Sequence, residues 1–461
     1  MSNDTICALA TAPGGALGII RVSGSHALEI LSHLFTKNLT TAPGFTIHYG
    51  HVVVPCDAVY PHQVIDEVLV SIFRTPHSYT GEDMAEISCH GSRYILNKVL
   101  ELLQQQGCRM ARPGEFTQRA YLNDKMDLSQ AEAVADLIAS TNKATHNIAL
   151  SQLRGHFSSD LSRLRKQLLK LTSLLELELD FSDHEDLEFA NRSELLNLAQ
   201  TIDAHITRLA HSFETGQAIK QGIPVAIVGK TNVGKSTLLN RLLKDDRAIV
   251  SDIHGTTRDT IEDTIDINGI TFRFIDTAGI RQTTDEVEQI GISRTYAAIS
   301  KARIVLWLID ETPTEAEVAD ITSRMSRDGH VPARTLIPVW NKSDILPPSH
   351  VYCDIIAAPI PISAKTGHGI EALEQAIYAA ADIPTLSDSN IIVTNARHYE
   401  ALCRAHDSLS RVLSGLESGL SGDLIAEDLR LTLTHLAEIT GGLITPQETL
   451  NSIFSSFCVG K

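Results

Sequence analysis

The spacing of hydrophobic and polar residues along this chain changes near residue 124. Before that point, short apolar runs separated by turns rich in Gly and Pro predict strands, and amphipathic spacing predicts helices between them. The predicted strands are residues 17–22, 48–54 and 64–73, and the predicted helices are 25–35 and 92–105. We therefore predict an α+β domain over residues 1–120.

A helical pattern begins at about residue 124, and the next ninety residues contain no proline. Leucines at 161, 164, 168, 171 and 175 follow the alternating three- and four-residue spacing of an apolar helix stripe. Such a stripe is expected of a helix that packs inside its own domain, and equally of a helix that forms an interface with a second chain. Spacing alone leaves both alternatives open.

Strands and helices alternate between residues 217 and 383, which predicts an α/β domain. Its predicted strands are residues 225–228, 270–275, 304–309, 336–340 and 360–362. After Pro384 the pattern is helical again, with leucines recurring on one predicted helix face from 402 to 420. The simplest architecture is one helical domain, made of residues 121–216 and 384–461, into which the α/β domain of residues 217–383 is inserted.

Composition narrows the classes of partner. Lys and Arg total 39 against 56 acidic residues, a net charge of −17, so non-specific contact with nucleic acid or an anionic membrane is disfavoured. The seven cysteines form no Cys-x-x-Cys pair, which argues against a disulfide framework or a zinc site. No run of eighteen apolar residues and no signal peptide are present. We expect a cytoplasmic protein that makes no membrane contact.

The residues from Gly229 to Ser236, GKTNVGKS, fit the pattern G-x-x-x-x-G-K-S directly after a predicted strand and before a predicted helix. In this motif backbone N–H groups surround phosphates, a lysine (here Lys235) reaches them, and a hydroxyl (here Ser236) binds Mg²⁺. The Asp276-Thr277-Ala278-Gly279 segment follows the next long strand, where its carboxylate can hold the magnesium shell through water.

Two further segments predict guanine as the base. Asp344, in Asn341-Lys342-Ser343-Asp344, can accept two parallel hydrogen bonds from guanine, and adenine offers no such pair of donors. Ser363-Ala364-Lys365 follows one more strand and would offer a backbone N–H to the guanine oxygen. The predicted GTP contacts are Asn232, Val233, Gly234, Lys235, Ser236, Thr237, Ser251, Asp252, Ile253, His254, Gly255, Thr256, Thr257, Asp276, Thr277, Ala278, Gly279, Asn341, Lys342, Asp344, Ser363, Ala364 and Lys365.

The residues for hydrolysis are less clear from pattern alone. Thr256 and Thr257 compete to complete magnesium coordination, and we favour Thr257. The position that holds a water-orienting glutamine in small GTPases is Ile280, so the catalytic group comes either from another protein or from a nearby carboxylate, Glu286 or Glu288. Asn232 is either a ligand for a monovalent cation or a structural asparagine.

Taken together, these residues resemble the family of tRNA modification GTPases called MnmE or TrmE. The resemblance covers nearly the whole chain and rests on GKTNVGKS, GTTRD, DTAGI with DEVE, NKSD and SAK. Outside that domain it rests on DTICALATAPGGALGIIRVSG, SYTGEDMAEISCHG, ARPGEFTQRAYLNDKMDLSQAEA and the closing Cys-Val-Gly-Lys. It implies a GTP hydrolase that works with an FAD-dependent partner, MnmG or GidA, on carbon five of the tRNA wobble uridine.

The resemblance also implies roles for single residues. Glu288 matches the catalytic glutamate, and Ser236 and Thr257 match the magnesium ligands. Potassium would be held by Asn232 and the loop residues Ser251, Ile253 and Thr256. The N-terminal domain would form a homodimer and bind 5-formyltetrahydrofolate or a related tetrahydrofolate through Arg21, Glu82, Lys125 and Lys461. Cys458 is the candidate for chemistry in the modification step.

A different class of function stays open at this point. A ribosome-assembly GTPase would share the same nucleotide-binding segments and use GTP to time its contact with RNA. Such proteins usually add a basic RNA-binding module or a second phosphate loop, and neither is present in this sequence. The modification GTPase is therefore the preferred hypothesis.

Overall fold

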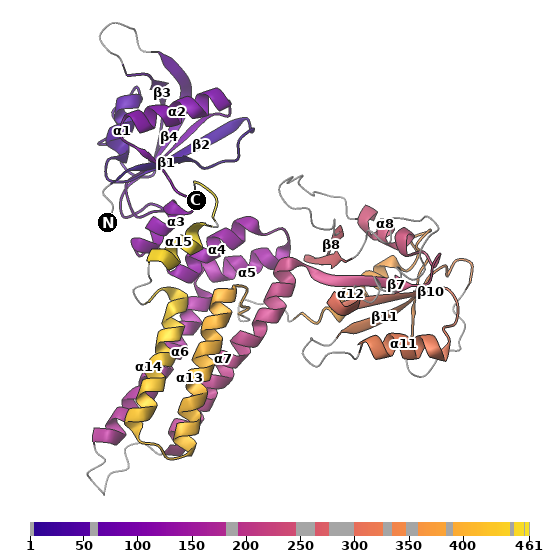
Figure 1. Cartoon of the computed structure of the whole chain (residues 1–461). Coiled ribbons are helices and arrows are strands. Elements are labelled where there is room, and N and C mark those ends of the chain that lie inside the picture. The colour runs from indigo at the N-terminus through magenta and orange to yellow at the C-terminus, as the bar shows by residue number, and fades with distance from the viewer. Residues whose placement is uncertain are drawn as a thin grey trace. The chain divides into compact units, whose positions relative to one another are not determined.

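A computed structural model of the chain describes residues 4–55, 63–180, 192–245, 263–275, 299–325, 334–346, 358–383, 391–442, 447–455 and 457–460. The chain forms two compact units (Figure 1). The first unit comprises Met1–Ala139, Ala149–Ile206 and Ala401–Lys461, and the second comprises Ser140–Ile148 and Thr207–Glu400. The chain therefore leaves the first unit twice, at Ser140–Ile148 and at Thr207–Glu400, and the longer of these two segments contains the inserted domain.

The first unit begins with a six-stranded sheet in the order β3-β4-β5-β2-β1-β6. All neighbours are antiparallel except β1 and β6. The strands are β1 Ile6–Leu9, β2 Leu17–Ser23, β3 Thr46–Val53, β4 Val64–Phe73, β5 Met84–His90 and β6 Arg109–Met110. Helices α1 Ala27–Leu34 and α2 Arg93–Gln105 contribute apolar side chains to the core beneath this sheet. The predicted α+β pattern of this part of the chain is confirmed.

The rest of the first unit is helical. Its elements are α3 Glu115–Leu122, α4 Leu128–Ala139, α6 His156–Asp180, α14 Gly422–Thr440 and α15 Gln447–Ser455, together with parts of α5 Lys143–Leu153, α7 Arg192–Gln221 and α13 Ala396–Glu417. The leucine stripe of α6 is at most 3% exposed, and α14 packs against this helix. The leucine stripe is therefore buried by packing within this chain. The predicted C-terminal face is shorter than expected, because α13 ends at Glu417 and Leu420 beyond it is 45% exposed.

The second unit holds another six-stranded sheet, in the order β12-β11-β10-β7-β9-β8, in which only β8 is antiparallel to its neighbour. Its strands are β7 Ile223–Gly229, β8 Asp263–Ile267, β9 Ile270–Phe274, β10 Ile304–Ile309, β11 Thr335–Trp340 and β12 Ile360–Pro361. Its helices are α8 Lys235–Asp245, α11 Glu315–Met325 and α12 Ile370–Ala380. The predicted α/β pattern is confirmed.

The strand order places β7 between β9 and β10, so the chain passes to opposite sides of β7 after it. In open parallel sheets, ligands bind outside the carboxyl ends of the strands at such a switch point. The loops that follow β7, β10, β11 and β12 therefore lie at one edge of the sheet, which is where a site is expected.

Candidate functional site

The loop from Gly229 to Ser236 begins at the carboxyl end of β7. Gly229, Asn232 and Gly234 have φ angles of 151°, 60° and 101°, so the backbone curls in a way that side-chain-bearing residues rarely adopt. A Cβ atom on Gly234 would collide with the amide nitrogen of Asn341. The backbone N–H groups of such a curled loop form a cradle for phosphate oxygens.

Lys235 is half-buried at the start of α8, and Ser236 and Thr237 follow in its first turn. The ammonium group of Lys235 donates hydrogen bonds to the carbonyls of Gly229 and Lys230, each at 2.7 Å. Burial lowers the pKa of Lys235 below the ordinary value of 10.5, because it removes water from the charged form. A phosphate group beside this ammonium would favour the charged form, as the predicted role requires.

Asn341, only 3% exposed, connects the phosphate loop to the loop after β12. Its side-chain amide donates to the carbonyl of Val233 at 2.7 Å, and its side-chain oxygen accepts from the backbone N–H of Ala364 at 3.0 Å. One buried side chain thus fixes the spacing between the segments that are predicted to bind the phosphates and the base. The sequence predicted Asn341 as a nucleotide contact, but the structure also gives it this connecting role.

The loop after β11 leaves Asp344 exposed, as a residue that receives a ligand must be. Lys342, with φ of 60°, pairs with Asp310 at 2.6 Å. The backbone N–H of Ser343 donates to the carbonyl of Ile362 at 3.0 Å, which ties this loop to the residue that follows β12. The two loops that are predicted to contact the base are therefore held together by this hydrogen bond.

The loop after β12 is stabilised by contacts that sequence reasoning missed. The Ser363 hydroxyl accepts from the N–H of Thr366 at 3.2 Å, and Arg241 of α8 donates to the carbonyl of Lys365 at 2.7 Å.

The phosphate loop has long-range partners as well. Its residue Lys230 pairs with Glu311 at 2.5 Å and with Glu317 at 2.8 Å. These partners are distant in sequence, and no motif marks them.

Several predicted residues lie outside the described part of the chain, and their roles stay predictions. They are Ser251, Asp252, Ile253, His254, Gly255, Thr256, Thr257, Asp276, Thr277, Ala278, Gly279, Ile280, Glu286, Glu288 and Lys461.

The predicted folate residues lie on the first unit. Arg21 of β2 is opposite Glu86 of β5, and its guanidinium donates to that carboxylate at 2.8 and 3.0 Å. The same group lies 5.5 Å from the ring centroids of Tyr79 and Phe116. It also donates to the carbonyl of Gly460 at 3.1 Å. Arg21 thus joins the first sheet to the last described residues of the chain.

The final segment, which we define as the end of α15 and residues 457–460, packs closely against the N-terminal part of the first unit. The N–H of Gly114 donates to the carbonyl of Cys458 at 3.4 Å, and a Cβ on Gly114 would lie 2.7 Å from the carbonyl oxygen of Phe454. Gly460 has φ of 92°, and a Cβ there would collide with the carbonyl of Leu9. This segment brings the exposed thiol of Cys458 to the part of the unit that holds Arg21.

Glu82 and Lys125, also predicted for folate, lie around the turn that precedes β5. The Glu82 carboxylate accepts from the Ser23 hydroxyl at 2.8 Å, and Ser23 is two residues beyond Arg21 on the same strand, hence on the same face. Lys125 donates to the carbonyl of Pro76 at 2.8 Å. Three of the four predicted residues therefore belong to one region.

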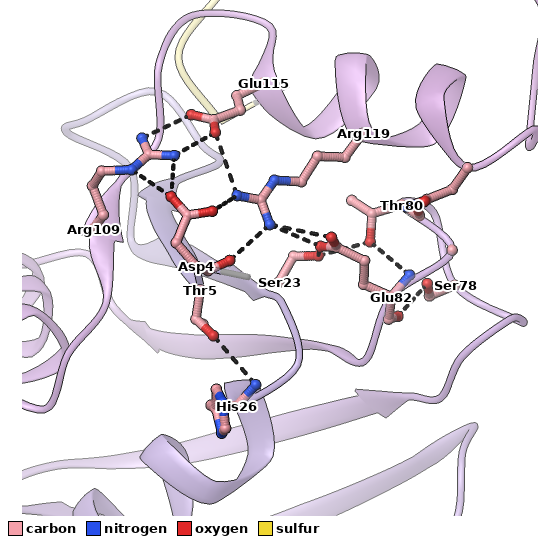
Figure 2. Close-up of polar contacts among 12 residues, drawn as sticks. Asp4, Thr5, Ser23, His26, Ser78, Thr80, Glu82, Arg109, Glu115 and Arg119 are labelled. Atoms are coloured by element: carbon pink, nitrogen blue, oxygen red, sulfur yellow. Dashed lines mark hydrogen bonds and ion pairs between the residues drawn. The ribbon is translucent and has the colours of Figure 1, made fainter. Parts of the chain in front are cut away.

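Sequence reasoning missed an ion-pair cluster next to Glu82, which Figure 2 shows. Arg109 and Arg119 share the carboxylates of Asp4 and Glu115, and Arg119 also contacts Glu82. Burial alone would raise the pKa of Glu115. Its hydrogen bonds from Arg109 and from the backbone N–H of Arg112, with the two nearby positive charges, lower it below the ordinary value. A single arginine in a helix gives no such signal in sequence.

The curled loop at the switch point, its lysine, and the two linked base-binding loops define a P-loop protein of the GTPase class. Within the described residues, no helix is both long and apolar enough to cross a lipid bilayer.

Two family models match the chain. Residues 5–125 match "GTP-binding protein TrmE N-terminus", and residues 128–458 match "MnmE helical domain". The "tRNA modification GTPase MnmE" of Phocaeicola vulgatus is 52% identical over 499 residues, covering 100% of this chain and 99% of the relative. The protein of the same name from Bacteroides thetaiotaomicron is 51% identical over 477 residues, covering 100% of both chains. The chain therefore belongs to the MnmE (TrmE) family, as its motifs predicted.

Among solved structures, that of Era in complex with MgGDPNP and nucleotides 1506–1542 of 16S ribosomal RNA is 26% identical. It matches 40% of this chain and 66% of its own, with a TM-score of 0.26. This likeness is too slight to say anything about function.

Proposed function

We propose that this chain is a GTP hydrolase that acts in the modification of tRNA. The observation that carries the proposal is the Asn341 connection, which links a phosphate cradle to the two segments expected to read guanine. Membership in the MnmE family supplies the biological setting. The finer proposal is that the chain works with an FAD-dependent MnmG (GidA) partner, in the cytoplasm, at carbon five of the wobble uridine.

The residues present suit the expected ions. The hydroxyls of Ser236 and Thr257 are hard oxygen ligands of the kind Mg²⁺ prefers, alongside phosphate oxygens. Asn232 is exposed at the rim of the cradle, so its side-chain oxygen can serve as a K⁺ ligand together with Ser251, Ile253 and Thr256. When bound, both ions would offset the negative charge that develops on the phosphates during hydrolysis. Glu288 would orient the attacking water.

A second site is proposed for the first unit, where a homodimer would bind 5-formyltetrahydrofolate as the one-carbon donor. Arg21, Glu82 and Lys125 belong to one region, and the segment that ends at Lys461 adjoins Arg21. Cationic Arg21 and Lys125 suit a ligand that carries carboxylates. Cys458, exposed on the same segment, is the proposed reactive group of the modification step.

GTP turnover in potassium and in sodium tests the ion assignment. We expect faster hydrolysis in potassium at saturating GTP, and equal rates would contradict the role of Asn232. Glu288→Ala should abolish turnover while GTP affinity is unchanged, and Glu286→Ala is its matched control. If Glu286→Ala abolishes turnover instead, the assignment of the catalytic carboxylate is wrong.

Analysis of tRNA tests the biological role. A strain that lacks this chain should lose the modified wobble uridine, wild-type protein should restore it, and the Glu288→Ala variant should not. An unchanged modification level in the deletion strain would contradict a role in tRNA modification.

A further inference from the structure

Arg119 of α3 is almost fully buried, at 6% exposure, yet it carries a permanent positive charge. Buried charges persist only when they are paired and hydrogen-bonded. We infer that Arg119 is a positioning residue that orients the Glu82 carboxylate toward the folate ligand. This inference rests on the folate site of the proposed function and adds a residue that touches no ligand itself.

The contacts of Arg119 hold it in one orientation. One terminal nitrogen donates to both Glu82 oxygens, at 3.1 and 3.2 Å, and to the backbone carbonyl of Asp4 at 3.0 Å. The other terminal nitrogen donates to the Asp4 carboxylate at 2.8 Å and lies 3.4 Å from Glu115 (Figure 2). A planar guanidinium with partners on both nitrogens cannot rotate without breaking several contacts at once.

Glu82 is held from its other side by neutral groups. The Ser23 hydroxyl donates to its carboxylate at 2.8 Å and is itself 2.7 Å from the Thr80 hydroxyl. The Ser78 hydroxyl donates to the Glu82 backbone carbonyl at 2.5 Å, which fixes the main chain beneath it. With Arg119 on one side and Ser23 on the other, the plane of the carboxylate is determined.

The held carboxylate still has capacity for a ligand. Its side chain is 23% exposed, and the contacts within the described residues use three of the roughly four acceptor positions of a carboxylate. Among the described contacts of this cluster, three carboxylates share two guanidinium groups. A fixed, partly exposed anion of this kind suits neighbouring N–H donors on a flat heterocycle, which a pterin ring offers.

Arg109 provides a matched control because it shares two of the carboxylates but not the third. It donates to Asp4 at 2.8 Å and to Glu115 at 2.5 and 3.0 Å, and it makes no contact with Glu82 among the described residues. Removing Arg109 disturbs the same cluster without releasing Glu82. A purely structural role would make the two arginines equivalent in ligand binding.

The test measures binding of 5-formyltetrahydrofolate to the full-length protein, with the thermal unfolding temperature recorded for every variant. Arg119→Met should weaken binding about tenfold to a hundredfold, the range that loss of a charge-assisted contact produces. Arg109→Met should leave affinity within about twofold of wild type, although both variants unfold at lower temperature. In a Glu82→Ala background, Arg119→Met should weaken binding no further, because its effect passes through Glu82.

Four outcomes would overturn the inference. Unchanged affinity of a folded Arg119→Met protein would remove the positioning role while the folate site stands. Equal losses in Arg109→Met and Arg119→Met, or an added loss in the Glu82→Ala background, would show that Arg119 acts through general stability. If the wild-type protein does not bind 5-formyltetrahydrofolate, the folate part of the proposed function fails together with the inference.

Discussion

The two six-stranded sheets arrange their polar groups in different ways. At the edge of the parallel sheet, backbone conformation makes the site, with glycines at positive φ and loops tied together by Asn341. On the antiparallel sheet, side chains make it, with Arg21, Glu82 and Arg119 held by ion pairs and by a segment from the far end of the chain. The first arrangement should be the more sensitive to added atoms, and the second should depend also on charge and pH.

The largest expected effect is on the parallel sheet. Gly234→Ala adds a Cβ that collides with Asn341 and strains a backbone at φ of 101°. We expect GTP affinity to fall about a hundredfold or more, with no change in folate binding, measured by titration of each ligand. Gly367→Ala is the control, since its φ is 92° but the nearest atom would be 3.7 Å away. Equal losses would mean that strain alone matters.

A second variant in the same site tests the spacing between the two loops without adding a steric clash. Asn341→Ala adds no atom and removes the two hydrogen bonds through which the Asn341 side chain connects the phosphate loop to the loop after β12. With about 1 kcal/mol for each bond, GTP affinity should fall about thirtyfold. Nucleotide titration checks this. An affinity close to that of wild type would show that the two loops keep their spacing without Asn341.

On the antiparallel sheet, an added atom should act through the docked segment. Gly460→Ala would push this segment away from Leu9 and so from Arg21, and folate affinity should fall about tenfold. GTP hydrolysis without folate should not change. Gly107→Ala is the matched control, because its φ is 104° and nothing lies within 4 Å of the added Cβ. A loss in the control as large as that in Gly460→Ala would contradict the docking role.

The smallest expected effect concerns pH. The pKa of Glu115 is lowered below 4.5 in the folded state, so its ionised form stabilises the fold above pH 4.5. That contribution should be lost as the pH falls below 4.5 and through the folded-state pKa. Thermal unfolding across this range checks it. Glu115→Gln should be less stable at neutral pH and show a weaker decline in acid; an unchanged decline would assign acid sensitivity to other groups.

The difference between the sheets also explains how much could be predicted from sequence. The segments predicted to bind the phosphates and the base are continuous motifs at strand ends, so sequence alone is enough to propose Gly234, Lys235 and Asp344. The links between these segments were not predictable, because Arg241 of α8 looks like any exposed charge until the fold brings Lys365 beside it.

Two other features gave too little signal. Strand β8 points only Ile265 and Ile267 toward the core, which is a weak apolar pattern. Arg119 becomes distinctive only when folding brings Asp4 and Glu82 to it, over 115 and 37 positions of the chain. Arg21 and Glu82 came from family resemblance, since each alone is an ordinary surface charge.

The contact between Arg21 and Gly460 joins residues 439 positions apart, which matters during synthesis. At about 5–20 residues per second, Arg21 is made roughly 20 to 90 seconds before its partner. The antiparallel sheet can fold during that interval, but the surface around Arg21 has no closing segment until residue 460 emerges. The proposed folate site should therefore be among the last parts of a newly made molecule to mature, after the proposed nucleotide site.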